Sequence, residues 1–169
     1  MTTVPLHPAL VHVPLGLAFV LPLVTAALAI ALWRGLVTRR TWIVAVALQA
    51  VLLAGGTLAL KTGERDEKRV ERITGEQAIH AHEDAAELFV WGAAIVLGLA
   101  AAVTVVPRRT IAPFAAIAAA GNFVVAGLAY RTGKAGGELV YARGAATAYT
   151  GAAPASPAQA QLDAHEEDD

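Results

Sequence analysis

Residues 41–60 read Thr-Trp-Ile-Val-Ala-Val-Ala-Leu-Gln-Ala-Val-Leu-Leu-Ala-Gly-Gly-Thr-Leu-Ala-Leu, a run without one charged side chain. A helix of about 20 residues crosses the ~30 Å hydrocarbon core of a bilayer. Three further, largely apolar runs occupy about residues 9–33, 82–106 and 111–131. Because a backbone in lipid must satisfy its own hydrogen bonds, each run is expected to be a helix. The sequence therefore predicts an all-α, integral membrane four-helix bundle.

The composition supports this class and excludes several functions. Of the 169 residues, 56% are hydrophobic and 16% are charged, and the charges fall in clusters between the apolar runs. The formal net charge of -1 argues against a nucleic-acid partner. The absence of cysteine excludes disulfides, thiolate metal sites, iron–sulfur clusters and c-type haem.

Two short loops carry positive charge only, and they define the expected topology. Arginines of short loops favour the cytoplasmic side, which leaves both termini on the other side. The N-terminal sequence lacks a positive signal-peptide region, so the first apolar run is expected to remain as an anchor. The membrane domain is assigned to residues 1–144, and the Ala-, Pro- and acid-rich residues 145–169 are expected to form a disordered tail. The loop arginines are Arg34, Arg39, Arg40, Arg108 and Arg109.

An internal repeat indicates that the bundle consists of two parallel helical hairpins. Residues 58–63 (Leu-Ala-Leu-Lys-Thr-Gly) match residues 128–133 (Leu-Ala-Tyr-Arg-Thr-Gly), 70 positions later. The same spacing relates His12 to His82. An axis along the membrane normal would then place these two histidines at equal depth. Chance similarity between Ala- and Leu-rich helices is the competing interpretation.

Facing imidazoles in a helical bundle are typical of b-type haem ligation, which leads to the first candidate site. We expect His12 and His82 to converge, with the small residues Gly16 and Ala86 leaving room beneath the rings. His7 flanks the pair in sequence. The haem would also need apolar walls, expected from Phe19 and Phe89. Its propionates would need cations, expected from Lys61, Arg131 and Arg143. The competing roles are interfacial anchoring for the histidines and snorkelling for Lys61 and Arg131.

The same histidines allow a second interpretation, a zinc or copper site. Imidazole suits both ions, and His7, His12, His80 and His82 are the candidate ligands. His80 and His82 lie on different faces of one helix, so only one of them can point inward. The carboxylates beside them also fit a solvated face at a helix N-terminus.

Two local features are predicted at the non-cytoplasmic end. Thr74 with Gln77 forms a possible capping box that would start the third helix. The stretch Gly136-Gly137 to Gly144 suggests a tight turn followed by a short extended segment.

Several of these stretches together resemble a known family. They are His-Pro-Ala-Leu-Val-His-Val-Pro-Leu-Gly at residues 7–16, Thr62-Gly63, His82, and Gly-Gly-Glu-Leu-Val-Tyr at residues 136–141 followed by Gly144. The chain resembles the predicted bacterial membrane proteins of domain of unknown function 2231 over about residues 5–145. The resemblance implies four membrane helices, a place for His7, His12 and His82 in the family pattern, and no established reaction. With the loop charges, it points to a multi-pass protein of the bacterial inner membrane.

The leading expectation is a redox subunit that holds haem b and passes electrons near the outer surface, to a quinone or a periplasmic partner. A zinc- or copper-binding or sensing protein is the second expectation. A structural subunit of a homo-oligomer or larger membrane complex is the third. No nucleophile–base pair indicates a hydrolase, so independent catalysis is not expected.

Overall fold

The computed structural model describes residues 6–150, and in this range the chain is helical throughout apart from short turns. The prediction of an all-α bundle is confirmed. The elements in chain order are α1 (Leu6–Leu10), α2 (His12–Trp33), the 3₁₀ turn η1 (Arg39–Trp42), α3 (Ile43–Thr74), α4 (Glu76–Ala102), the 3₁₀ turn η2 (Arg108–Thr110), α5 (Ile111–Tyr141) and α6 (Thr147–Thr150).

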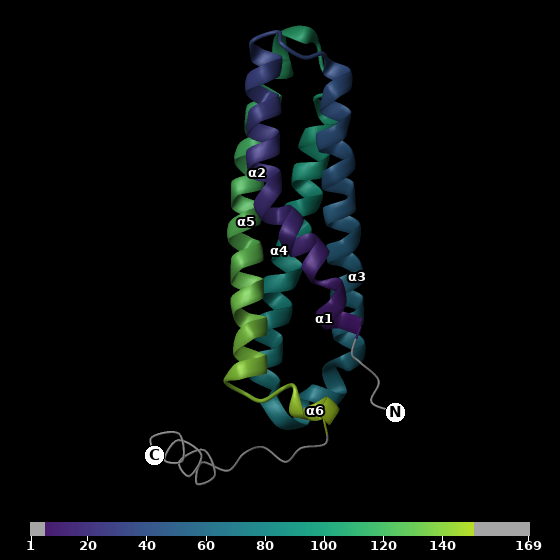
Figure 1. Ribbon diagram of the computed structural model, residues 1–169, viewed down its shortest axis with the longest axis vertical. Helices are drawn as coiled ribbons and strands as arrows, with labels where there is room; N and C mark the ends of the chain where they lie inside the picture. The colour runs from purple at the N-terminus through teal and green to yellow at the C-terminus, as the bar shows by residue number, and fades with distance from the viewer. Residues whose placement is uncertain (1–5, 151–169) are drawn as a thin grey trace, which may run out of the picture.

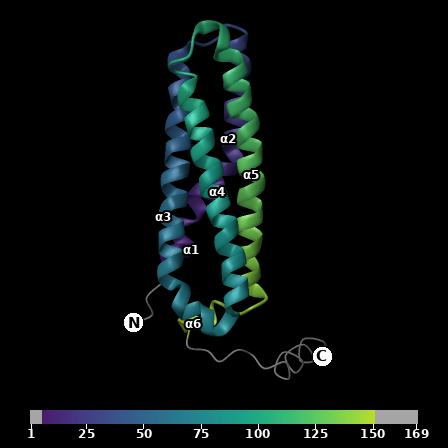
Figure 2. The same ribbon diagram turned by 180° about the vertical axis from the view of Figure 1, so that it is seen from behind.

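The four long helices form an elongated bundle in which α2 and α4 each pack against both α3 and α5 (Figure 1). Helices α3 and α5 therefore lie at opposite corners, and the view from behind shows α4 between them (Figure 2). The turns with η1 and η2 lie together at one end, here called the arginine end. At the other end, the junction end, α3 meets α4 at Gly75, and α6 lies beside that joint.

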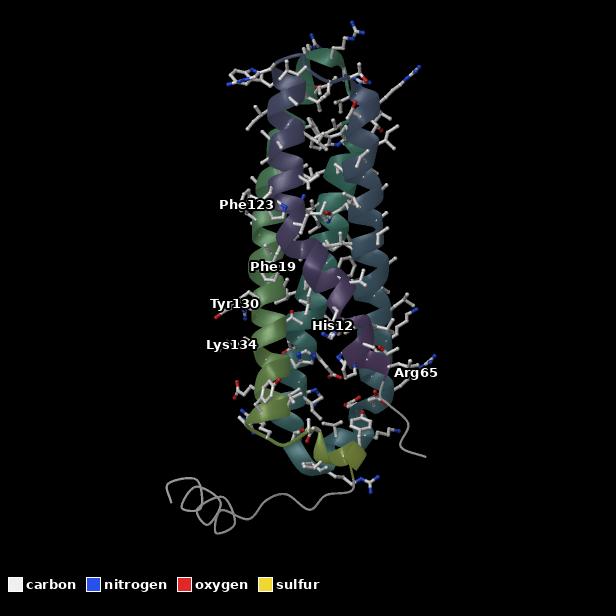
Figure 3. The ribbon with its side chains drawn as sticks, in the orientation of Figure 1. His12, Phe19, Arg65, Phe123, Tyr130 and Lys134 are labelled. Atoms are coloured by element: carbon white, nitrogen blue, oxygen red, sulfur yellow. The ribbon has the colours of Figure 1, made fainter. Side chains whose placement is uncertain are left out.

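All four long helices are long and apolar enough to cross a membrane. Large apolar side chains also remain exposed around the bundle, as expected for a surface that faces lipid. Figure 3 shows Phe123 and Tyr130 on the outer side of α5, where their side chains are 56% and 64% exposed. At 32 residues, α3 is roughly 48 Å long, so it extends well beyond a ~30 Å hydrocarbon core.

The first apolar run is broken near its start. Pro14 has no N–H to donate to the carbonyl of Leu10, and the helix is interrupted at Val11. Val11 itself keeps α-helical dihedral angles, and Figure 1 shows α1 and the first part of α2 running together obliquely toward α3, whereas the rest of α2, which contains Pro22, runs along the bundle. His7 and His12, on either side of Val11, therefore project about 140° apart around this segment.

The repeat is clear in the second helix of each hairpin but not in the first. Residues of α3 and α5 that lie 70 positions apart are buried together, for example Ala45 with Ala115 and Ala59 with Ala129. In α2 and α4 the same spacing pairs a buried position with an exposed one, as Ala18 with Leu88. The spacing of 70 therefore describes α3 and α5 only.

The junction end differs from the sequence prediction in three respects. Thr74 ends α3 and its hydroxyl donates to the Val70 carbonyl, so the predicted cap at Thr74 is wrong, and Gly75 makes the joint with φ 81°. Helix α5 continues through Gly136 and Gly137, so the turn predicted there is wrong as well. Residues 145–150, assigned to the tail, pack against the bundle end, whereas residues 151–169 lie outside the described range.

Candidate functional site

Two histidines from different hairpins meet inside the junction half of the bundle. His7 of α1 and His82 of α4 have ring centroids 6.1 Å apart, with the ring planes at 87° in an edge-to-face contact. Both side chains are half-buried. They are 75 positions apart in sequence and come from opposite halves of the repeat, so only the tertiary fold brings them together.

His7 is oriented by the backbone of α3. Its Nδ1 lies 2.8 Å from the carbonyl oxygen of Ala59. A carbonyl can only accept, so Nδ1 carries the proton and donates. The Thr62 hydroxyl, 3.5 Å from the same nitrogen, donates to the carbonyls of Ala59 and Leu58. In the neutral ring, Nε2 of His7 is therefore left with its lone pair available.

His82 lies against the backbone of α5, beside Gly136 and Thr132. Its Nδ1 is buried and has no hydrogen-bond partner among residues 6–150. Buried nitrogen atoms of side chains are normally paired, so this atom is an exception among the described residues. In His7 the nitrogen left for a ligand is Nε2, whereas Nδ1 of His82 lies against the backbone of α5 near Gly136 and Thr132.

Each imidazole rests on a glycine in the second helix of its own hairpin. A Cβ at Gly63 of α3 would lie 3.2 Å from Cε1 of His7, and a Cβ at Gly136 of α5 would lie 3.1 Å from Cε1 of His82. Gly16 has open space around it, so the prediction that Gly16 leaves room beneath an imidazole is wrong. The repeated Thr-Gly that ends at Gly63 and the Gly-Gly pair at Gly136 were the available signals for these contacts.

The remaining predicted ligands lie elsewhere. His12 is exposed on α2, so the predicted pairing of His12 with His82 is replaced by His7 with His82. The physical reason is their position on the helical segment: His7 and His12 are five residues apart, so their side chains project about 140° apart around its axis, and the side that carries His7 faces α3. His80 is exposed on α4 and lies 3.4 Å from both Glu76 and Glu83.

The two predicted wall residues also differ from each other. Phe89 is buried and its ring packs over Gly56 of α3, where a Cβ would be 3.0 Å away. Phe19 is 52% exposed on the outer side of α2. The predicted symmetry of the two rings is therefore wrong, because the spacing of 70 does not hold between α2 and α4.

The predicted cations do not surround the His pair. Lys61 and Arg131 are exposed, as in the snorkelling interpretation. Arg143 lies 3.5 Å from the Thr74 carbonyl and 3.8 Å from Glu138, so it ties the end of α5 to the end of α3. No group of three or more His, Asp or Glu side chains is placed to hold a metal within residues 6–150. An ion at the His pair would therefore have two ligands from the described side chains.

The best-formed hollows of the junction end are not at the His pair. One lies on α4 alone, and the other lies between α4 and α5, beside Leu139 and Arg143. Neither is lined by His7 or His82. The pair is therefore packed into the bundle as a small site.

Comparison with known proteins is consistent with this picture of a membrane bundle. The family model described as "Predicted membrane protein (DUF2231)" matches residues 3–149. The chain belongs to this family. The resemblance seen in the sequence is thus confirmed, and the matched region includes all four long helices and both histidines of the pair. No curated protein and no solved structure matches the chain.

Proposed function

We propose that this membrane protein binds a single transition-metal ion, copper in the first place, between His7 and His82. By the positive-inside rule, the arginine end faces the cytoplasm and the metal lies in the opposite half of the membrane. The proposal depends on one observation, the contact of two half-buried imidazoles from different hairpins.

The ring geometry is compatible with a shared ion. Metal–imidazole bonds are about 2.0–2.1 Å long, which places two rings on one ion roughly 5–6 Å apart between centres. The 6.1 Å between the ring centroids of His7 and His82 is close to this spacing, and a shared ion requires the rings to turn from their edge-to-face contact so that a nitrogen of each points to it. The hydrogen bond from His7 Nδ1 to the Ala59 carbonyl is the kind of outer contact that orients a metal-ligating histidine.

The number of ligands favours copper over zinc. Zinc in proteins is almost always four-coordinate, and it would need further ligands that the described side chains do not supply. Cu⁺ is stable with two nitrogen ligands, and imidazole is among the side chains that bind copper. The half-buried setting also limits water, which would otherwise complete a zinc shell.

A b-type haem is the second candidate, because two imidazoles on opposite sides of one iron have a similar spacing. It requires a slot wide enough for the porphyrin between the two rings. His7 and His82 are in direct edge contact, so α1 would have to move away from α4 to admit it. Electron transfer to a quinone or a partner protein would follow from either redox-active ligand.

The test is a copper titration of the purified protein in nanodiscs, with a chromophoric Cu⁺ chelator as competitor. The wild type is expected to bind one Cu⁺ per chain. His7→Ala and His82→Ala should each weaken binding at least about tenfold, equivalent to about 1.4 kcal/mol. His12→Ala and His80→Ala remove exposed imidazoles and serve as matched controls with unchanged affinity.

Each alternative has a distinct result. Equal binding by all four variants, or no binding by the wild type, contradicts the copper site. A Soret band that copurifies with the wild type and is lost in His7→Ala identifies haem. A chain that binds neither ligand is left with the structural role.

The two glycines beneath the rings give a second, independent prediction. Gly136→Val should displace the His82 ring and weaken Cu⁺ binding roughly 10–100-fold, as is typical when an orienting contact is lost. Gly137→Val is the matched control, because nothing lies within 4 Å of a Cβ at that position. Both substitutions place a β-branched residue at adjacent positions of α5, so their intrinsic helix cost is the same. Equal affinities for the two variants would contradict the positioning role of Gly136.

A further inference from the structure

The centre of the bundle contains two buried amide side chains between two apolar clusters. On α3, Gln49 lies between Ala45 of the cluster nearer the arginine end and Leu52 of the other cluster. On α5, Asn122 lies in the same way between Ala118 and Val125. The side chains of Gln49 and Asn122 are each only 1% exposed. Helix α4 relates the levels of the two amides. Gln49 contacts Ala93 of α4, and Gly121, the neighbour of Asn122, lies against Val96, about one helical turn further along α4. Both amides are therefore at a similar level.

The orientation of both amides is determined by their donors. Gln49 Nε2 donates to the Ala93 carbonyl of α4 at 3.1 Å. Asn122 Nδ2 donates to the Ala118 carbonyl at 3.2 Å and has a longer contact, 3.5 Å, with the Thr25 hydroxyl of α2. Because carbonyls cannot donate, the nitrogens must face them, and the amide oxygens face elsewhere.

Both amide oxygens are left without a hydrogen-bond partner. Gln49 Oε1 and Asn122 Oδ1 are buried and unpaired among residues 6–150. They belong to α3 and α5, which occupy opposite corners of the bundle and both pack against α2 and α4 (Figures 1 and 2). Unpaired acceptors are rare in protein interiors, and they are costlier in a membrane bundle that excludes bulk water.

We infer that one water molecule is bound at the bundle centre and donates a hydrogen bond to Gln49 Oε1 and another to Asn122 Oδ1. Water is the smallest species with two donors, and buried waters typically bridge buried polar groups that lack partners. A metal cation is disfavoured, because neutral amides without a carboxylate do not compensate its charge in the membrane. The water therefore links the two hairpins through α3 and α5, which do not pack side by side.

The first test detects the water directly, by magnetisation transfer from water to ¹⁵N-labelled side-chain amides in nanodiscs. Cross-peaks are expected at both Gln49 and Asn122. The Trp42 indole N–H, buried and bonded to the Ala100 carbonyl at 2.9 Å, is the internal control without a cross-peak. Water signals at only one amide, or at neither, overturn the inference.

The second test asks whether the two amides share one water. Gln49→Met and Asn122→Leu keep the side-chain volume and remove the acceptor. If the water is shared, each single variant abolishes the water cross-peak of the remaining amide. The thermal midpoint of the double variant then falls by less than the sum of the two single shifts. Strictly additive shifts, with the remaining cross-peak retained, overturn it.

Discussion

Trp42→Ala should destabilise the protein by about 3–5 kcal/mol, the usual cost of removing a large aromatic side chain from a core. Trp42 is fully buried at the arginine end, where it packs with Ala45, Ala100 and Val103. Its indole N–H also donates to the Ala100 carbonyl. The substitution leaves a cavity beside four helix ends and removes the hydrogen bond that ties η1 to α4. The measurement is the unfolding free energy from an SDS titration in mixed micelles.

Two other tryptophans provide the control for this prediction. Trp33 and Trp91 are 71% and 68% exposed on the outside of the bundle. Their replacement by Ala removes contact with lipid or detergent and leaves no internal cavity, so the loss should be far smaller. Trp42→Phe retains most of the ring but leaves the Ala100 carbonyl unpaired, and an intermediate loss is expected. Similar losses for Trp42→Ala and Trp91→Ala would contradict the assignment of Trp42 to the core.

Gly121→Leu should destabilise the bundle by about 1–3 kcal/mol, the typical cost of overpacking. A Cβ at Gly121 of α5 would lie 2.7 Å from Cγ2 of Val96 on α4, too close for any side chain unless Val96 or the helices shift. Gly92 of α4 is similarly close to Leu128 of α5, at 2.9 Å. Small residues at such positions let membrane helices approach closely, and α4 and α5 depend on them.

Gly127→Leu is the matched control on the same helix. Nothing lies within 4 Å of a Cβ at Gly127, and the residue is exposed. Replacing a glycine inside a helix gains up to about 1 kcal/mol of helix propensity, so this variant should be neutral or more stable. The two substitutions are therefore expected to have opposite signs in the same SDS titration. Destabilisation by both, to the same extent, would argue against close packing at Gly121.

The sequence was sufficient for the four membrane helices and for the repeat of the second helices. Long runs such as residues 41–60 leave a chain in lipid no alternative to helix, because unpaired backbone groups are too costly there. The Thr-Gly motif at Gly63 and Gly133 has the correct spacing of 70, since α3 and α5 are regular helices with the same burial pattern. Periodicity is a local property, so it can be derived from neighbouring residues alone.

The tertiary structure alone decided which histidines meet. Sequence spacing paired His12 with His82, but the side of the first helical segment that faces the bundle interior carries His7 and leaves His12 exposed. The side of α1 that turns inward depends on its packing against α3, including the bond from His7 to the Ala59 carbonyl 52 residues away. Such a contact has no local signal, because it is determined by the balance of packing among separate helices. The helices thus follow from residue order, whereas the His pair follows from how those helices pack.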